Sequence, residues 1–225
     1  MNFPHIVIAI DGPAASGKSS VARQLAQRIG FLYVNTGAMY RAIAWLATLR
    51  QIPAADTGRV QQLLHFSDIE CGVAEGASTI LVDHLDPTPH LNEAAVNATV
   101  SAIASIVDVR RLLVLKQRAY ARDHDLVMEG RDIGSAVFPQ TPYKFYIDAS
   151  LEVRAQRRAR QGHEDSIAAR DQTDSTRVAS PLLIAEDAHV IDSSHLTIDG
   201  VVGEIVGRLK LKGLKFADRG MRVVP

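Results

Sequence analysis

The chain has 225 residues, 47% of them hydrophobic, which is enough to bury the core of one domain or of a core domain that carries an insert. Because 25 Lys and Arg residues balance 25 Asp and Glu residues, there is no excess of positive charge for holding a nucleic-acid backbone or an anionic membrane. The single cysteine, Cys71, excludes an intrachain disulfide, and the apolar run near the start is too short for a signal peptide or a membrane span, so we expect a cytoplasmic protein.

The first part of the chain alternates between strand and helix patterns. Residues 5–10 are a short β-branched run that predicts a strand, and apolar residues at helical spacing follow up to Gly30. Residues 31–34 predict a second buried strand, and the helical pattern after it ends at Pro53. This order of strand, glycine-rich loop and helix is typical of a nucleotide-binding α/β unit.

The pattern changes between residues 54 and 92. Two short strands are expected there, at 66–71 and 79–82, and we interpret the stretch as an insert. Helical patterns return at about 93–106 and 109–122, with Asp108 as the expected N-cap of the second helix.

The rest of the chain continues the alternation. Further core strands are expected at 126–128, 143–147 and 188–191, and a closing helix at 198–209. The charged stretch 152–177 is expected to project from the core as a helical arm or mobile flap. We therefore predict an α/β protein with a five-stranded, mainly parallel sheet. The predicted division is a core at 1–53, 108–150 and 178–212, an insert at about 54–107, a lid at about 151–177 and a basic tail at 213–225.

One motif carries the chemistry. The segment from Gly12 to Ser19, GPAASGKS, matches G-x-x-x-x-G-K-[ST], in which backbone N–H groups surround a phosphate and the following helix adds its dipole. Lys18 is expected to reach the β and γ phosphates, and the Ser19 hydroxyl to bind Mg²⁺. The predicted ATP-binding residues of this loop are Gly12, Pro13, Ala14, Ala15, Ser16, Gly17, Lys18, Ser19 and Ser20.

A phosphate loop does not by itself distinguish an enzyme from a switch. The N-K-x-D motif by which GTPase switches read guanine does not occur in the sequence, whereas arginines are frequent, which favours a kinase. The candidate phosphate clamps are Arg41, Arg110, Arg131, Arg154, Arg157, Arg158, Arg170 and Arg177. Arg154, Arg157 and Arg158 are equally compatible with a solvated helix face. Arg170, Asp174 and Arg177 share a helical face that is also compatible with a surface salt-bridge stripe.

A second segment, Glu129-Gly130-Arg131-Asp132, follows a predicted core strand, where ligands of open α/β sheets bind. Arg131 and Asp132 are suited to hold a phosphate and an amino group, with a simple turn ion pair as the alternative. The eight histidines lack the spacing of metal ligands, so we expect magnesium to arrive with the nucleotide.

Five segments resemble those of bacterial cytidylate kinases: IDGPAASGKSS, VNTGAMYRA, Ser101 to Arg110, EGRDIGSAVFP and RDQTDSTRVASPL. They occur in the same order, from about residue 5 to 207. The resemblance implies the nucleoside monophosphate kinase fold, with an acceptor-binding insert and a lid. The sequence departs from the family pattern at Thr173, a position that is often Arg, and the stretch between Arg158 and Arg170 is shorter.

The resemblance also implies roles for particular residues. The acceptor-site residues are Thr36, Tyr40, Arg41, Ser101, Arg110, Arg131, Asp132, Arg170, Asp174 and Arg177, with cytosine read by Ser101, Arg110 and Asp132. Arg157 belongs to the lid over the triphosphate, and Lys18, Arg131 and Arg177 are the catalytic candidates. The implied reaction is ATP-dependent phosphorylation of CMP or dCMP with Mg²⁺, by a protein that we expect to be a monomer. The alternatives are a P-loop kinase for another small acceptor such as UMP, and a non-catalytic ATP-binding module.

Overall fold

The computed structural model describes residues 4–160, 167–177 and 180–220, without the side chain of Arg170. Its strands are β1 (Val7–Asp11), β2 (Leu32–Asn35), β3 (Ile69–Ala74), β4 (Ala77–Val82), β5 (Leu126–Gly130), β6 (Tyr143–Asp148) and β7 (His189–Asp192). Its helices are α1 (Lys18–Ile29), α2 (Thr36–Leu49), α3 (Thr57–Phe66), α4 (Ala94–Ser105), α5 (Val107–Tyr120), α6 (Leu151–Arg160), α7 (Ile167–Thr176) and α8 (Ile198–Leu211). A 3₁₀ turn, η1 (Thr88–His90), and a π-helical turn, η2 (Ile133–Val137), complete the described elements.

The sheet has the order β3-β4-β2-β5-β1-β6-β7 within the described residues. The predicted five-stranded parallel sheet is confirmed, because β2, β5, β1, β6 and β7 are consecutive in this order and all pair in parallel. The hairpin of β3 and β4 extends this sheet at one edge, where β4 pairs with β2 through Ala77 and Tyr33. The insert strands are therefore continuous with the core sheet, which the sequence pattern did not indicate.

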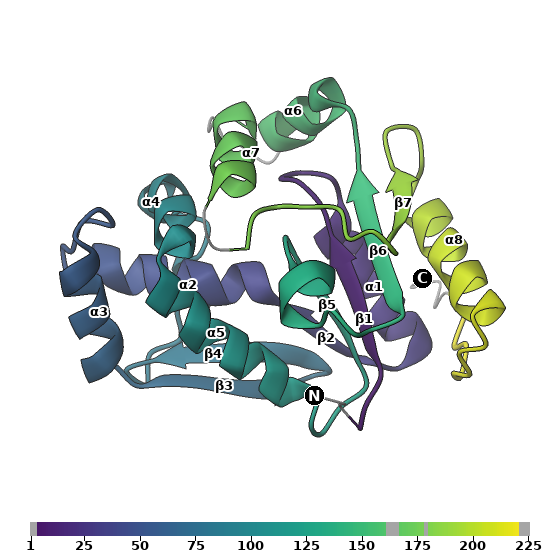
Figure 1. The fold of residues 1–225 in the computed structure, drawn as a ribbon, viewed down its shortest axis with the longest axis horizontal. Coiled ribbons are helices and arrows are strands. Elements are labelled where there is room, and N and C mark those ends of the chain that lie inside the picture. The colour runs from purple at the N-terminus through teal and green to yellow at the C-terminus, as the bar shows by residue number, and fades with distance from the viewer. Residues whose placement is uncertain (1–3, 161–166, 178–179, 221–225) are drawn as a thin grey trace.

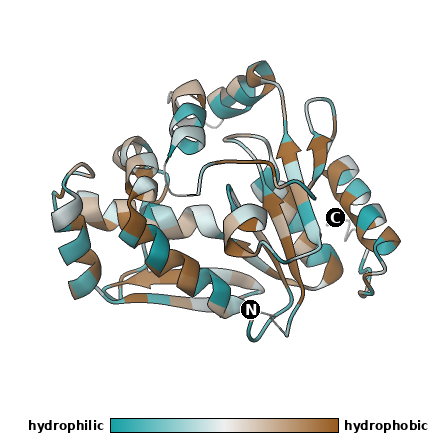
Figure 2. Ribbon diagram, in the orientation of Figure 1, coloured by the Kyte–Doolittle hydropathy of each residue, from teal (hydrophilic) through white to brown (hydrophobic). Residues whose placement is uncertain are grey.

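Helices cover both faces of the sheet (Figure 1). The alternation of β1 shows how the faces are divided: Ile8 and Ile10 pack in the cluster that contains residues of α1 and α8, whereas Val7 and Ala9 pack with Tyr120 of α5. Figure 2 shows the hydrophobic colouring concentrated in the strands and on the sides of the helices that face them. No helix among the described residues is both long and apolar enough to cross a membrane.

Two details of the sequence prediction were wrong. Residues 66–71 are not one strand, because α3 extends to Phe66 and β3 begins only at Ile69. The helix α3 was missed because its apolar stripe is short: Val60 is buried, while Leu63 and Leu64 pack against the core only partly buried. Asp108 is not an N-cap: the extended backbone of Ile106 ends α4 and begins α5, so Asp108 lies in the first turn.

The predicted insert and the predicted lid approach one another where α4 contacts α7. The insert helices α3 and α4 share one hydrophobic cluster with α2 and α5, including Val60, Ile43 and Ile103. The charged helices α6 and α7 lie beyond the carboxyl ends of the strands (Figure 1), as the predicted arm requires. Residues 161–166 and 178–179 of the predicted lid and its junction lie outside the described residues. The division into core, insert and lid stays a prediction.

Candidate functional site

The strand register places the two sequence motifs side by side. Asp11 at the end of β1 pairs with Gly130 at the end of β5, so the loop after each strand leaves the same edge of the sheet. A cavity of about 630 Å³ lies there, lined by the phosphate loop, the start of α2, α4, the segment after β5, and α6 and α7. The predicted residues on its wall are Ala14, Ala15, Ser16, Gly17, Lys18, Ser19, Ser20, Thr36, Tyr40, Arg41, Ser101, Arg131, Asp132, Arg157, Arg158, Asp174 and Arg177.

The phosphate loop has the tight geometry that its glycines allow. Gly17 has φ 90°, in the left-handed region, and precedes the first turn of α1. A Cβ on Gly12 would lie 2.1 Å from the carbonyl oxygen of Ile147, so this position needs glycine. The buried Lys18 extends back over the loop, where its Nζ donates to the carbonyl of Pro13 at 3.0 Å. Gly12 and Pro13 belong to the loop but do not line the cavity.

Oxygen ligands that suit Mg²⁺ meet at the start of α1. The Ser19 hydroxyl donates to the Glu129 carboxylate at 2.9 Å, and Glu129 ends the buried strand β5. A hydroxyl and a carboxylate are the hard oxygen donors that this ion prefers, so the residues fit the predicted ion. Glu129 was not predicted to belong to the site. An acidic residue near the end of a buried strand could have indicated a magnesium ligand.

The arginines of α6 do not form a solvated face, so that alternative was wrong. Arg154 and Arg158 are buried, and Arg157 donates through Nη1 to the Ser16 carbonyl at 3.2 Å and to the Ser193 hydroxyl at 3.0 Å. Arg157 is thereby fixed against the phosphate loop, and its role over the triphosphate stays a prediction. Ser193 was not predicted to belong to the site.

A carboxylate of α7 also contacts the phosphate loop. Asp171 accepts from the backbone N–H of Ala14 at 3.3 Å and is paired with Arg154. Asp171 of α7 and Arg154 of α6 are thereby both connected to the loop. Asp171 was not predicted to belong to the site, because the resemblance implied roles only for Arg170, Asp174 and Arg177 of this segment.

Asp132, predicted to read cytosine, lies between two buried arginines. Its Oδ2 accepts from Arg110, and its Oδ1 lies 3.5 Å from Nη2 of Arg177. Burial lowers the pKa of Arg177, while the Asp132 carboxylate acts in the opposite direction. Three residues that are far apart in the sequence therefore meet, and the simple turn pair of Arg131 with Asp132 does not form. The reading of cytosine by Ser101, Arg110 and Asp132 stays a prediction.

Arg131 instead pairs with α7. Its Nε donates to Asp174 Oδ2 at 2.9 Å. Burial opposes the charge of Arg131, but the carboxylates of Asp174 and Glu129 outweigh it and raise the pKa of the guanidinium. Since Asp174 and Arg177 are both buried, their side of α7 is not a surface salt-bridge stripe. The side chain of Arg170 lies outside the described residues.

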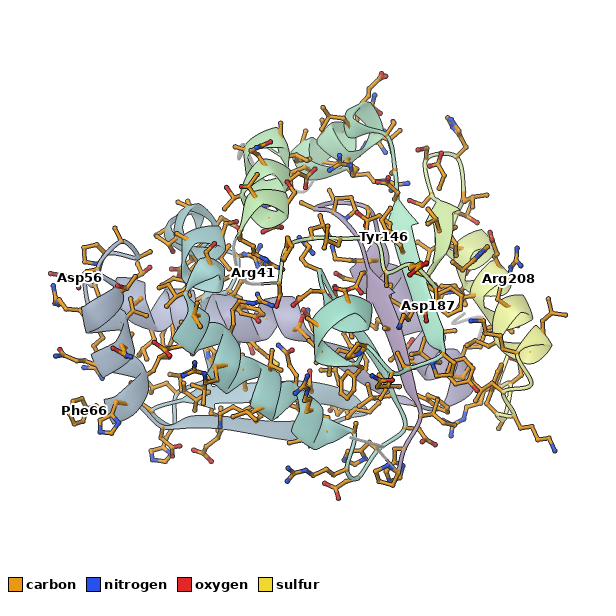
Figure 3. The ribbon with its side chains drawn as sticks, viewed as in Figure 1. Arg41, Asp56, Phe66, Tyr146, Asp187 and Arg208 are labelled. Carbon is orange, nitrogen blue, oxygen red and sulfur yellow. The ribbon has the colours of Figure 1, made fainter. Side chains whose placement is uncertain are left out.

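The remaining acceptor-site candidates line the α2 side of the cavity. Thr36 is buried and donates to the Glu129 carbonyl at 2.8 Å. The Arg110 guanidinium carbon lies 5.4 Å from the Tyr40 ring centroid, and burial raises the pKa of Tyr40 to about 12. Arg41 donates to the Leu91 carbonyl at 2.8 Å, and Figure 3 shows it where α2 and α4 approach one another.

Asp11 supports the site from beneath. Its carboxylate accepts from the backbone N–H groups of Ile133 at 2.8 Å and Gly134 at 2.7 Å, at the start of the π-helical turn that follows Asp132. Burial raises the pKa of Asp11 to about 7, although both hydrogen bonds act to lower it. Asp11 precedes the phosphate-loop motif and was not predicted to contribute.

A parallel α/β sheet with a phosphate loop, a carboxylate beside the loop serine and several convergent arginines defines a P-loop phosphotransferase. The family model for cytidylate kinase matches residues 8–211. The chain belongs to the cytidylate kinase family.

Similar proteins cover most of the chain. A cytidylate kinase from Desulforamulus reducens is 42% identical over 213 residues, which are 90% of this chain and 96% of that protein. A cytidylate kinase from Symbiobacterium thermophilum is 41% identical over 89% of this chain and 94% of its own length. Among solved structures, a gluconokinase from Sinorhizobium meliloti 1021 is 14% identical over 94% of this chain and 95% of that one, with a TM-score of 0.49.

Proposed function

We propose that this protein transfers the γ-phosphoryl group of ATP to CMP or dCMP, giving ADP and CDP or dCDP. The choice of acceptor rests on the position of Asp132. This residue lies on the wall of the cavity that the phosphate loop also lines, and its carboxylate is held by Arg110 and Arg177. A carboxylate beside an arginine complements the amino donor and the ring-nitrogen and carbonyl acceptors of cytosine. Uracil has a carbonyl in place of that amino donor.

The donor site is formed by the phosphate loop. Its backbone N–H groups and the start of α1 bind the triphosphate, and Lys18 releases the Pro13 carbonyl to reach the β and γ phosphates. Ser19 and Glu129 hold Mg²⁺, which neutralises phosphate charge when it is bound with ATP. Arg157, already fixed beside Ser16, covers the triphosphate from the lid side.

The acceptor site lies across the cavity. Arg131 and Arg177 bind the acceptor phosphate, and Thr36, Tyr40 and Arg41 complete the α2 side. Arg170 and Asp174 of α7 contact the sugar, and Ser101 of α4 joins Arg110 and Asp132 at the base. These assignments agree with the burial and convergence of the described side chains.

The chemical step needs positioning more than proton transfer. An oxygen of the acceptor phosphate attacks the γ phosphorus in line, a new P–O bond forms, and the bond to the β–γ bridging oxygen breaks to leave ADP. A phosphate monoester is already a nucleophile near neutral pH, so no general base is assigned. Lys18, Arg131 and Arg177 stabilise the negative charge on the transferring group.

The lid excludes water during this step. Helices α6 and α7 contact the phosphate loop through Arg157 and Asp171, and closure over bound nucleotides suppresses hydrolysis of ATP. In this proposal the lid is residues 151–177 and the acceptor-binding insert is about 54–107. A cytoplasmic location and a monomeric state stay predictions.

The test is ADP formation from Mg²⁺-ATP with CMP, dCMP, UMP, AMP and GMP as acceptors. The wild-type protein is compared with Asp132→Ala and with the control Asp86→Ala, which alters an exposed carboxylate that does not line the cavity. A preference for CMP and dCMP that only Asp132→Ala loses supports the proposal. Equal rates with all acceptors, or ATP binding without acceptor-dependent ADP release, contradict it and favour another small acceptor or a binding module respectively.

A further inference from the structure

A buried amide lies behind the acceptor site. Asn97 belongs to α4, one helical turn before Ser101, and is 7% exposed within an otherwise apolar helix side. Buried amides are retained where their hydrogen bonds are satisfied, because an unpaired polar group in the interior costs free energy. The partners of Asn97 therefore indicate why the chain keeps an amide at this position.

The hydrogen bonds of Asn97 fix its orientation. Its Nδ2 donates to the Asn92 carbonyl at 2.8 Å, in the turn before α4. Because the nitrogen is fixed there, Oδ1 faces the opposite direction, where it accepts from Arg41 Nη1 at 2.6 Å and from Arg158 Nη2 at 3.3 Å. One oxygen thus receives hydrogen bonds from two guanidinium groups.

These partners come from separate parts of the molecule. Arg41 lies on α2 of the core, Arg158 on α6 of the lid, and Asn97 on α4 of the insert. Arg41 and Arg158 also line the cavity, whereas Asn97 reaches it only through them. A single side chain therefore links the three segments whose approach forms the acceptor site.

The side-chain amide of Asn97 is a hydrogen-bond acceptor that carries no charge. A neutral oxygen can accept from two cations without adding a negative charge that would compete with a phosphate for them. A carboxylate in the same place could form both hydrogen bonds but would weaken the attraction of the arginines for an anion. A methyl group would leave the two guanidinium groups without this shared acceptor.

We propose that Asn97 is a positioning residue that holds Arg41 and Arg158 toward the phosphate of the acceptor nucleotide when the lid meets the insert. This inference rests on the proposed function, because it assigns the phosphate of CMP as the anion that the two arginines receive. Asn97 itself does not touch the nucleotide. Its effect is on acceptor binding rather than on ATP binding, since the phosphate loop receives its contacts from other residues.

The experiment compares Asn97→Ala, Asn97→Asp and the control Thr99→Ala, which alters a half-buried residue of the same helix whose hydroxyl donates to the Ala95 carbonyl within the helix. Steady-state rates give KM for CMP and for ATP, and inhibition by cytidine reports binding of the base and sugar without the phosphate. We expect KM for CMP to rise about tenfold in Asn97→Ala and further in Asn97→Asp. KM for ATP and the inhibition constant of cytidine should stay within about twofold of the wild-type values.

Several outcomes overturn the proposal. Unchanged KM for CMP in both Asn97 variants, with an active wild-type enzyme, removes the positioning role alone. A parallel rise in both KM values, weaker cytidine inhibition and a lower melting temperature show a purely structural role. If the wild-type protein does not phosphorylate CMP, the proposed function fails first and this inference fails with it.

Discussion

The guanidinium of Arg177 lies 3.5 Å from the carboxylate of Asp132, and both side chains are buried. This contact connects the residue after α7 to the residue after β5, and Arg110 binds the other oxygen of the same carboxylate. The predicted acceptor site is therefore organised around one carboxylate between two guanidinium groups. Breaking a buried arrangement of this kind leaves an uncompensated charge, so its members are sensitive to substitution.

Arg177→Met should strongly impair the enzyme. The variant removes one of the two cations beside Asp132 and a predicted ligand of the acceptor phosphate, so we expect kcat/KM for CMP to fall by at least about a hundredfold, close to 3 kcal/mol. Steady-state ADP formation measures this loss. Arg111→Met removes an exposed arginine of α5 and serves as the matched control. Equal kcat/KM in the two variants would exclude Arg177 from the site.

Lys18→Met should abolish phosphoryl transfer without unfolding the protein. Lys18 is expected to move from the Pro13 carbonyl to the phosphates, where its charge stabilises the transferring group. We expect kcat to fall by about a thousandfold or more, while the far-ultraviolet circular dichroism spectrum is unchanged. The exposed Lys215→Met is the control. Wild-type turnover in Lys18→Met would remove the phosphate loop from the mechanism.

Local features of the site could be predicted from the sequence. The phosphate loop occupies eight consecutive residues between a strand and a helix, so its pattern and its structure are both local. The roles of Arg110, Asp132 and Arg177 followed only from the resemblance, because no spacing in the sequence shows that these three meet. The structure brings them together through the order of the strands and the position of α7.

Other features depend on contacts that sequence patterns do not encode. Asn97 differs from its apolar neighbours on α4, but its two arginine partners lie on α2 and α6. From the sequence, Asp11 is an ordinary turn residue before a glycine. Its role depends on hydrogen bonds from the backbone N–H groups of Ile133 and Gly134, which are far away in the sequence. The helix α3 was missed for a simpler reason, since its apolar stripe of Val60, Leu63 and Leu64 is short and only Val60 is buried.

Asp11 should make stability depend on pH. Its pKa is raised from 3.8 to about 7 by burial, so the native state prefers the protonated form more than the unfolded chain does. The contribution of protonated Asp11 to the free energy of unfolding is therefore fully present below pH 3.8, and it is lost as the pH rises to about 7. This interval corresponds to about 4 kcal/mol in the free energy of unfolding.

The measurement is urea unfolding of the wild-type protein and Asp11→Asn at several values between pH 4.5 and pH 8. The asparagine variant cannot titrate, so the difference in unfolding free energy between the two proteins should change across this range. Asp86→Asn, at an exposed carboxyl, serves as the control. Parallel stability curves for wild type and Asp11→Asn would show that Asp11 is ionised throughout, held by its two backbone hydrogen bonds.

Two glycine-to-alanine substitutions should have opposite effects. A Cβ at Gly12 would lie 2.1 Å from the Ile147 carbonyl oxygen, so Gly12→Ala must displace backbone at the start of the phosphate loop. We expect it to lower the free energy of unfolding by more than about 3 kcal/mol and to weaken ATP binding. Gly203 lies within α8 and no atom would approach its added Cβ within 4 Å, so Gly203→Ala should raise stability by about 0.5–1 kcal/mol. Urea unfolding and calorimetric titration with ATP measure both effects, and a Gly12→Ala protein as stable as Gly203→Ala would show that the loop can relax around the new methyl group.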